Sequence, residues 1–564
     1  MNRLGGAARY AVVVAIALAG IATPAAAGSG GQALSGFQRA TAELPALQAM
    51  VANHAVPTHL TANATPPAGS ISPNITFLSN LPLPSAISIG FIGNTAFVST
   101  VVGLYSVDIT DPTNPALLGS VPMYIWENEH MQVIPDKNLV IISRDPRGYT
   151  SPGTTIFPYG TVQIFDVSNP QAMVEIGTHF QPTGHTAACI NDCSYLWVAG
   201  PAAPCLSGLC IDSPGVPGLL APGPNPTWPG RPVWAVDITN PSSPKDCANA
   251  HFIDTNSHLG KTDYDHDADV DRSGVAWVAG SGHIRGYWTS GQHFNYADGK
   301  METATPCDPI EYAGANMVQG QFKDGGDMHN TGRNLGVSVD GRRGDVLAAT
   351  EENTTTTCSQ SGKFWTYDIG PTKGAAAQNP NLMYPVLDSW GTLHQNGTAQ
   401  SDGSNVAGQQ VGAITGCDSA HWFTDRGDGL IAIAFYSQGT RLLDIRDPRH
   451  ITQVGWYNVQ NTNTWAAYWH GDNYIYVADF ERGLDVLRYH GTNASGTIGG
   501  EGTTSSAPAP GAVAGGSSQP TPNTSAARTP LPAAPLAPLG LGLVAALVLT
   551  RRRVAGRKGT QTRT

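Results

Sequence analysis

Charged side chains are scarce in this chain. Asp, Glu, Lys and Arg make up 13% of its 564 residues, which is about half the usual share. The 42 acidic residues outnumber the 31 basic ones and give a net charge of −11, and the body between the two basic ends is more acidic still. Because such a body repels phosphate, nucleic acid is not an expected partner.

Motifs of the common enzyme classes are also absent. The chain has no Gly-x-Ser-x-Gly elbow, phosphate-binding loop, His-Glu-x-x-His helix or dinucleotide fingerprint, so hydrolase, kinase and dehydrogenase activities lack a supporting motif. If the chain has an active site, residues far apart in the sequence must form it. Catalytic residues therefore stay unassigned at this stage.

The two ends of the chain predict export and a membrane anchor. Residues 1–27 carry Arg3 and Arg9, an uncharged run and small residues up to Ala27, which is the layout of a signal peptide. Residues 28–79 are expected to form a leader, partly helical or extended. Residues 491–530 are rich in Gly, Ser, Thr, Ala and Pro and predict a disordered stalk. Residues 531–550 are uncharged and long enough for a transmembrane helix, and 551–564 form a basic cytoplasmic tail.

The anchor has one alternative. Residues 531–535 resemble a degraded sortase signal, but the Thr-Gly pair that a sortase cuts is missing. A plain membrane anchor is therefore favoured over covalent attachment to the wall. Either way, the body is expected at the extracellular face of the cell membrane or cell wall.

Eight cysteines in an exported chain predict disulfides. Zinc binding by Cys189 and Cys193 is the alternative, although no second close pair has the spacing of a zinc ribbon. The sequence does not fix the pairing, and Cys205 with Cys210 is the simplest local pair. The eight are Cys189, Cys193, Cys205, Cys210, Cys247, Cys307, Cys358 and Cys417.

An internal repeat dominates residues 80–490. Its most regular part is an apolar strand that ends in Asp and is followed by a Pro-containing turn, with clear copies at residues 103–109, 161–167, 232–238 and 439–445. Weaker copies lie at residues 282–288, 362–369 and 483–489, which makes seven units. Another apolar strand precedes each copy, at residues 96–99, 139–142, 195–198, 275–278, 345–348, 430–433 and 474–477. Seven four-stranded sheets around an axis would bury both faces of each sheet, so we expect an all-β, seven-bladed β-propeller.

The repeat also resembles a known family. The segment Gly-Leu-Tyr-Ser-Val-Asp-Ile-Thr-Asp-Pro-Thr-Asn-Pro, which begins at Gly103, is similar to the LVIVD repeats of exported bacterial proteins. The resemblance implies propeller blades and an exported protein, and it implies no particular activity. Units four, five and seven depart from the signature, so their boundaries are less defined.

The Asp of the repeat is expected to form a turn. A carboxylate that follows a strand accepts hydrogen bonds from nearby backbone N–H groups. We therefore assign a structural role to Asp108, Asp166, Asp237, Asp368 and Asp444.

A histidine recurs at similar positions in several units, which the folding of the blades alone does not require. Four units place one a short distance ahead of the apolar strand, at His130, His185, His266 and His421, and His329 lies somewhat further upstream in unit five. Unit seven has Trp465 there and unit one has Ser85. If these positions lie on the innermost strands, the imidazoles converge at the propeller axis and can share a transition-metal ion, as other propeller enzymes hold iron on axial histidines.

Several carboxylates lie close enough in sequence to bind the same ion or to orient the rings: Glu127, Glu129, Asp265, Asp267 and Asp327. The opposing interpretation is that each histidine satisfies a backbone group of its own blade. Packing is then its only role.

Two other patterns are discounted. Asp269, Asp271, Ser273 and Gly274 match the start of a calcium loop, but Gly280 stands where a bidentate Glu is required. The tripeptide at 426–428 has the form of a cell-adhesion signal and falls in a predicted hairpin turn.

Two functions of different classes remain open. The first is a binding module of the cell envelope, with an envelope protein or an extracellular polymer as partner, bound through the long insertions at residues 201–231, 289–328 and 370–416. The second is a metal-dependent enzyme of redox or lyase type, with its metal on His130, His185, His266, His329 and His421. The sequence leaves the metal, the substrate and the oligomeric state open.

Overall fold

The computed structural model describes much of the repeat region. It covers residues 60–123, 125, 128–144, 160–181, 184–200, 209–210, 221–222, 233–252, 265–280, 283–316, 327–352, 362–379, 381–392, 419–471 and 473–491. The expected signal peptide, stalk, transmembrane helix and tail lie outside these ranges. Contacts divide the chain into Met1–Gly515 and Gly516–Thr564, and the second unit falls wholly outside the described residues. Within the described ranges, no helix has the length and apolar character needed to cross a membrane.

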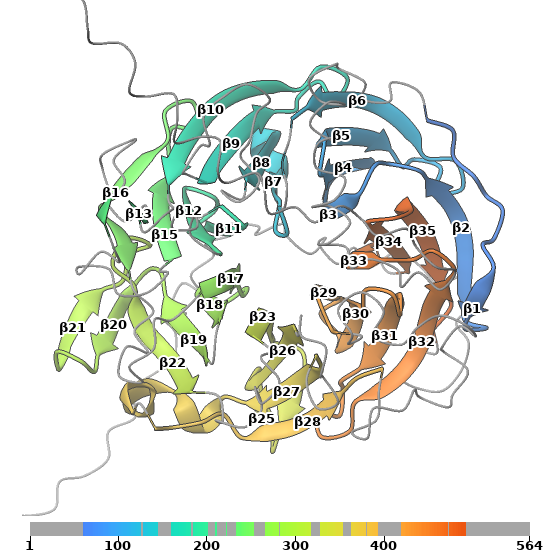
Figure 1. The fold of residues 1–564 in the computed structure, drawn as a ribbon. Helices are drawn as coiled ribbons and strands as arrows, with labels where there is room; N and C mark the ends of the chain where they lie inside the picture. The colour runs from blue at the N-terminus through green and yellow to red at the C-terminus, as the bar shows by residue number, and fades with distance from the viewer. Residues whose placement is uncertain are drawn as a thin grey trace, which may run out of the picture. The chain divides into compact units, whose positions relative to one another are not determined.

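Seven large antiparallel sheets form a β-propeller, as expected from the repeat (Figure 1). Blade 1 contains β3 (Ala86–Ile92), β4 (Thr95–Thr100), β5 (Gly103–Asp108) and β6 (Ala116–Pro122). Blade 2 contains β7 (Gln132–Ile134), β8 (Leu139–Arg144), β9 (Gly160–Asp166) and β10 (Val174–Gln181), with the short 3₁₀ helix η1 (Pro135–Lys137) in its first hairpin. Blade 3 contains β11 (Thr186–Ile190), β12 (Tyr195–Ala199), β15 (Val233–Asp237) and β16 (Lys245–Phe252).

The remaining blades follow in chain order. Blade 4 contains β17 (Asp265–Val270), β18 (Val275–Gly280), β19 (His283–Trp288) and β22 (Ile310–Asn316). Blade 5 contains β23 (Asp327–Asn334), β26 (Val346–Glu352), β27 (Phe364–Asp368) and β28 (Val386–Trp390). Blade 6 contains β29 (Phe423–Asp425), β30 (Leu430–Ala434), β31 (Thr440–Asp444) and β32 (Thr452–Val459), and blade 7 contains β33 (Thr464–His470), β34 (Tyr474–Asp479) and β35 (Gly483–Tyr489).

Smaller elements decorate the blades. Three hairpins pair β13 (Leu209–Cys210) with β14 (Ala221–Pro222), β20 (Gln292–Asn295) with β21 (Lys300–Thr303), and β24 (Ser338–Val339) with β25 (Arg342–Arg343). Two 3₁₀ helices, η4 (Gly370–Thr372) and η5 (Gly374–Gln378), precede β28. The expected insertions at 289–328 and 370–416 thus contain the outer strands of blades 4 and 5 as well as loops.

Strands from before residue 80 complete the last two blades. β1 (Gly69–Ile71) pairs with β32, and β2 (Ile75–Leu81) pairs with β35 in a register that sets Leu81 opposite Leu484. The expected leader over 28–79 therefore contributes two strands to the propeller. Because β2 comes from the start of the repeat region and β35 from its end, this pairing closes the ring.

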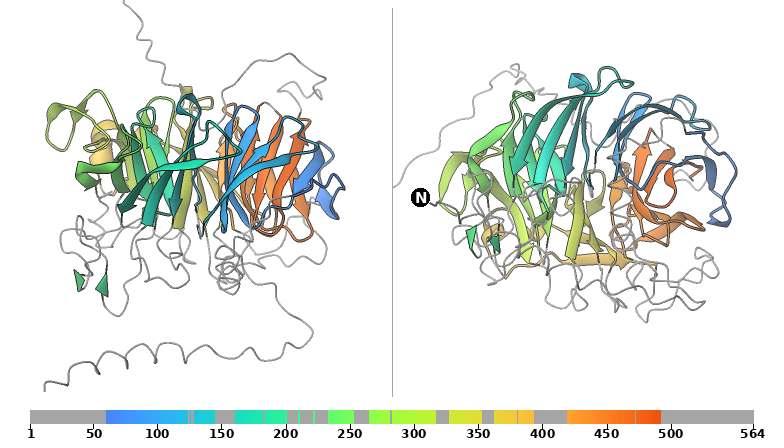
Figure 2. Two further views of the ribbon diagram at one scale, coloured as in Figure 1. Left: turned by 90° about the horizontal axis from the view of Figure 1, so that it is seen from above. Right: turned by 45° about the horizontal axis from the view of Figure 1, so that its top comes forward.

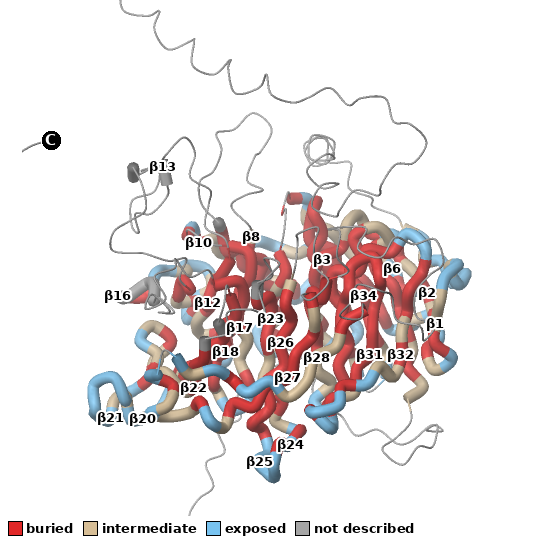
Figure 3. Tube along the Cα trace, turned by 60° about the horizontal axis from the view of Figure 1, so that its bottom comes forward, coloured by how far each residue is buried: buried red, intermediate tan, exposed pale blue. Residues whose placement is uncertain are grey.

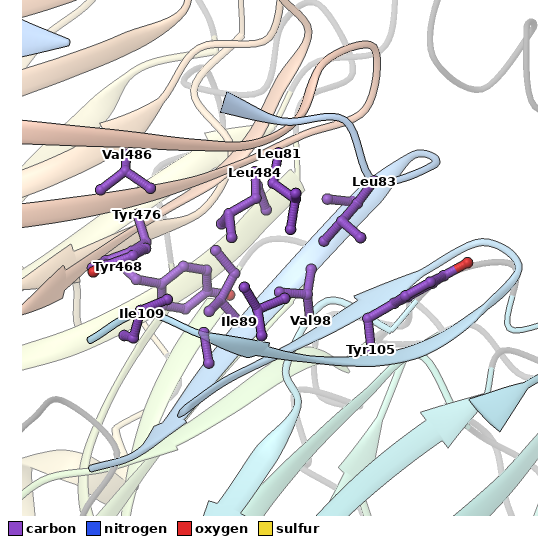
Figure 4. Packing of buried hydrophobic residues seen from close by; sticks show 14 of the residues in the cluster. Leu81, Leu83, Ile89, Val98, Tyr105, Ile109, Tyr468, Tyr476, Leu484 and Val486 are labelled. Atoms are coloured by element: carbon purple, nitrogen blue, oxygen red, sulfur yellow. The ribbon is translucent and has the colours of Figure 1, made fainter. Parts of the chain in front are cut away.

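Apolar packing holds the blades to one another. Seven buried clusters each contain side chains from two neighbouring blades, and together they occupy every blade-to-blade interface. Figure 4 shows the cluster between the last and first blades, where Leu81 and Val486 meet Ile89 and Val98. Both faces of each sheet are therefore buried, which explains the largely continuous red strands in Figure 3. Seen from the side, the strands of neighbouring blades run next to one another (Figure 2).

The repeated Asp forms the turn expected from the sequence. In every copy that carries it, one carboxylate oxygen accepts the backbone N–H two residues ahead at 2.9 Å; the pairs are Asp108 with Thr110, Asp166 with Ser168, Asp237 with Thr239, Asp368 with Gly370 and Asp444 with Arg446. The carbonyl of the Pro that follows accepts a hydrogen bond from the neighbouring blade. Ser106 Oγ of blade 1 donates to the Pro170 carbonyl, and Thr366 Oγ1 of blade 5 donates to the Pro448 carbonyl. The motif thus ends a strand and also ties adjacent blades together.

A conservative pair of variants tests this turn. Asp108→Ala removes the acceptor for the Thr110 N–H and is expected to lower the free energy of unfolding by about 1 kcal/mol. Asp108→Asn keeps an acceptor oxygen and should cost clearly less. Urea unfolding of both variants measures the difference, and equal losses would show that charge, rather than the hydrogen bond, is what matters at this position.

Candidate metal centre at the propeller axis

One register position brings seven residues to the axis, one from each blade. The third residue of the second strand pairs with a residue at or near the first strand. In every blade, the axial residue lies three positions before that pairing partner. The positions are Ile87, Glu129, His185, His266, His329, His421 and Trp465. We call this set the axial ring. In blades 1, 4, 5 and 7 the strand pairing is irregular at this point, as expected where a bulge redirects a side chain.

Four imidazoles surround the Glu129 carboxylate. Oε2 lies 3.2 Å from His185 Nε2, 3.5 Å from His266 Nε2 and 2.9 Å from His329 Nε2, and Oε1 lies 3.0 Å from His421 Nε2. The side chains of all five residues are at most 5% exposed. The structure thus brings together four of the five predicted histidines around a carboxylate.

Backbone carbonyls orient two of the rings. His266 Nδ1 donates to the carbonyl of His329 at 2.9 Å, and His421 Nδ1 donates to the carbonyl of Trp465 at 2.5 Å. Because a carbonyl can only accept, Nδ1 carries the proton in both rings, and Nε2 is the atom that faces the cluster. This is how proteins usually fix a histidine whose other nitrogen binds a metal.

The cluster contains more buried polar atoms than its hydrogen bonds can satisfy. His185 Nε2 and His266 Nε2 face each other at 3.0 Å. Among the described residues, Glu129 Oε2 and both ring nitrogens of His329 are buried and make no hydrogen bond of acceptable angle, although Oε2 and His329 Nε2 are only 2.9 Å apart. Unsatisfied buried polar atoms cost free energy, and a cation at their centre would satisfy them together.

The charges of these groups are shifted by their surroundings. Burial acts to raise the pKa of Glu129, but the nearby His185, His421 and His329 imidazoles hold it well below its ordinary range. Burial and the neighbouring His329 and His185 lower the pKa of His266 far below its usual value. These shifts favour a carboxylate at Glu129 and a neutral imidazole at His266. At His421, by contrast, burial alone would lower the pKa, but the Glu129 carboxylate raises it.

Trp465 occupies the ring position next to His421 and contacts two members of the cluster. Its indole Nε1 donates to Glu129 Oε1 at 3.2 Å, and its carbonyl holds His421. The rings of Trp465 and His421 are 5.0 Å apart. Trp465 therefore fixes the orientation of one carboxylate and one imidazole.

His130 is not part of the cluster, which corrects the prediction. The register puts Glu129 at the ring position of blade 2, so His130 lies one residue further along the chain, where it forms an isolated bridge with Thr186. Its Nδ1 lies 3.1 Å from Asp267 Oδ1, and its ring meets Trp422 edge-on at 4.9 Å. Although burial alone would lower the pKa of His130, the Asp267 carboxylate raises it.

Counting back from the second strands would not have identified Glu129 and Ile87 from the sequence. The axial residue precedes the third residue of the second strand by 12 positions in blade 2 (Glu129 to Ile141), by 10 in blade 1 (Ile87 to Phe97) and by 11 in blade 4 (His266 to Trp277), so the observed strand pairing is needed to find it. The search for histidines missed Glu129 as a ring member because it adjoins a histidine.

Glu352 and Tyr436 lie beside the cluster and were not predicted. Glu352 Oε2 is 4.0 Å from His329 Nε2, and its side chain is 20% exposed. The Tyr436 hydroxyl donates to Glu352 Oε1, and the Tyr436 ring lies 4.7 Å from that of His421. Tyr436 has a φ of 41°, a conformation that non-glycine residues adopt only where the surroundings enforce it.

The donor atoms form three ligand triads. In each triad, the donor atoms lie within 4.8 Å of one another. The triads are Glu129 with His185 and His266, Glu129 with His329 and His421, and His266 with His329 and Glu352.

Two of the other predicted carboxylates are buried near the axis. Asp265 begins β17, and Asp267 pairs with His130. Glu127 and the side chain of Asp327 lie outside the described residues.

The calcium-like segment is the hairpin between β17 and β18. Asp271 accepts hydrogen bonds from the Ser273 backbone, the Trp277 indole and the Arg333 guanidinium, so its oxygens serve the turn. The tripeptide at 426–428 lies in the turn between β29 and β30, as predicted, where Arg426 pairs with Asp428.

Two disulfides are present among the described residues. Cys189 pairs with Cys193, and Cys247 pairs with Cys307. The first pair excludes the zinc alternative for these two cysteines. The expected pair of Cys205 with Cys210 falls outside the description because Cys205 is not covered.

Residues 85–122 and 470–487 match the model of the LVIVD repeat. The match covers blade 1 and part of blade 7, a narrower extent than the similarity expected over 80–490. No curated protein matches the chain.

Among solved structures, the WD40 repeats of RRP9 are 9% identical, with a TM-score of 0.42, and the similarity covers 75% of this chain and 99% of that one. The extracellular domain of the putative hybrid two component system BT4673 from B. thetaiotaomicron is 9% identical, with a TM-score of 0.40 over 72% of this chain and 39% of that one. At these TM-scores, neither similarity adds to the fold assignment.

Proposed function

The chain is a β-propeller that matches the LVIVD repeat at residues 85–122 and 470–487, and on that premise we propose that its axis holds a transition-metal centre that performs metal-dependent chemistry. The observation that carries this proposal is the convergence of four Nε2 atoms, from four different blades, on the Glu129 carboxylate at 2.9 to 3.5 Å. Imidazole with one carboxylate is a ligand set suited to iron, zinc, copper or nickel.

A purely structural role for the histidines explains fewer of these observations than a metal centre does. A histidine that only stabilised its own blade would hydrogen-bond to that blade, and its second ring nitrogen would need no particular direction. Instead, His266 and His421 bond to the backbone of the next blade and direct Nε2 inward. His329 Nδ1, for its part, has no hydrogen bond among the described residues.

Each part of the site has a role in this proposal. The four histidines and Glu129 bind the metal, Trp465 orients Glu129, and the buried ring keeps bulk water away. When bound, the metal would supply Lewis acidity or electrons, and this suits the redox or lyase type of enzyme that the sequence left open as the alternative to a binding module. The side near Glu352 is the more exposed one and is where a substrate would approach.

Metal analysis of the purified full-length chain tests the proposal. We expect a stoichiometric transition metal by elemental analysis, and a lower metal content in the double variant His185→Ala, His266→Ala. The matched control is His450→Ala, because His450 is an exposed histidine that pairs only with Asp447 at the surface. A metal-free wild-type chain, not reconstituted by added Zn(II), Fe(II) or Co(II), would sink the proposal.

Binding to an envelope partner stays a prediction. The described residues offer one supporting observation, the β20–β21 hairpin, whose Phe294 is 43% exposed and whose Met301 is 61% exposed (Figure 3). The expected export and membrane anchor also stay predictions, and two disulfides fit an exported protein.

A further inference from the structure

We propose that the axis holds two metal ions rather than one, bridged by Glu129. This inference rests on the proposed metal centre and assigns its ligands to two positions. The first ion takes Glu129, His185 and His266, and the second takes Glu129, His329 and His421. These two triads share only Glu129.

The architecture divides the ligands in this way. The first pair of histidines comes from the neighbouring blades 3 and 4, and the second pair from the neighbouring blades 5 and 6. Two imidazoles and one carboxylate make a set of three protein ligands, which is the usual number in a catalytic metal site. Each pair can therefore complete one site with the shared carboxylate.

The Glu129 carboxylate is placed to bridge. Its two oxygens have different neighbours: Oε2 faces His185 and His266, whereas Oε1 faces His421. His329 is near Oε2, at 2.9 Å. Two ions in a shared site lie about 3.5–4 Å apart, a spacing that the two oxygens of one carboxylate commonly span.

Each triad also contains one ring that the backbone has already oriented. In the first triad it is His266, bonded through Nδ1 to a carbonyl of blade 5, and in the second it is His421, bonded to a carbonyl of blade 7. Each proposed position thus has its own pre-oriented nitrogen ligand, which lowers the cost of ordering the site.

Glu352 supplies a second carboxylate, which we assign to the second ion because its Oε2 lies 4.0 Å from His329 Nε2. Two divalent ions in a buried site need more negative charge than Glu129 provides. Glu352 forms a further triad with His266 and His329, and the Tyr436 hydroxyl holds it there. Glu352 is 20% exposed, whereas the ligands of both triads are at most 5% exposed, so Glu352 marks the accessible side of the site.

Cobalt titration separates two ions from one. Wild-type full-length chain, stripped of metal and titrated with Co(II), is expected to bind two ions per chain. The electron paramagnetic resonance signal per cobalt should be smaller at full than at half loading, because bridged ions couple. His185→Ala, His266→Ala and the matched His329→Ala, His421→Ala variant should each retain one ion.

The outcomes distinguish this inference from the proposed function. One cobalt per chain in the wild type, lost in both double variants, would overturn the two-ion arrangement and leave the metal centre standing. No cobalt at all would remove both. Glu352→Gln is expected to weaken the second binding step about tenfold and spare the first, whereas an equal effect on both steps would contradict its assignment to the second ion. Because the stoichiometry is measured on the wild type, misfolding of a variant leaves the test intact.

Discussion

Glu129→Gln is expected to lower the affinity of the axial site for Zn(II) or Co(II) at least about 100-fold, more than the loss of a residue that only supports a ligand. Gln keeps the size of the side chain but loses its negative charge. All four imidazoles then face a neutral amide, and the carboxylate that touches each Nε2 atom is gone. Competition with a chromophoric chelator measures the affinity.

The neighbouring residue provides the matched control. His130→Ala removes an imidazole one position away, which pairs with Asp267 and belongs to none of the three triads. Its metal affinity should stay within a few-fold of the wild type. Circular dichroism of both metal-free variants checks that the blades remain folded. If His130→Ala lost the metal and Glu129→Gln kept it, the ring register deduced for blade 2 would be wrong.

The strand repeat made the fold predictable from the sequence. All seven predicted copies form the third strand of a blade, and the apolar strands ahead of them form the second. This succeeded because both strands are buried on both faces, so each is a nearly continuous apolar run with clear turn signals at its ends. The shorter inner strands, such as β7 and β29, carry much less pattern.

The candidate site was predictable only in part, because the sequence does not show which residue of each inner segment faces the axis. Spacing brought His185, His266, His329 and His421 to the axis correctly. It failed for His130, because the spacing between the axial residue and the second strand differs from blade to blade, and a shift of one residue exchanges Glu129 for His130. Glu352 and Tyr436 belong to second-strand and turn positions, and only the three-dimensional arrangement brings them beside His329 and His421.

Ring closure through β2 was not predicted, because its strand lies before the first recognised repeat. Nothing in residues 75–81 marks them as the partner of a strand about 400 residues later. Only the observed pairing of β2 with β35 identifies these residues as partners. Because specific side chains meet across this pairing, mutations can test whether the ring closes.

Leu81→Ala is expected to destabilise the propeller by about 2–5 kcal/mol, the usual cost of truncating a fully buried leucine. Leu81 is 0% exposed and lies in the cluster that joins the last blade to the first (Figure 4). Urea unfolding measures the loss. Val174→Ala on the outer strand β10, where the side chain is 57% exposed, should change stability by no more than about 0.5 kcal/mol.

A double-mutant cycle between Leu81 and Leu484 tests the closure itself. The two residues are direct partners across the β2–β35 pairing, and both are fully buried. Truncating both to alanine should cost less than the sum of the single losses, by about 0.5 kcal/mol or more, because residues in contact are coupled. Strict additivity would mean that the two strands do not meet in solution. In that case the ring would be open, and residues from seven blades would no longer share an axis on which imidazoles could gather.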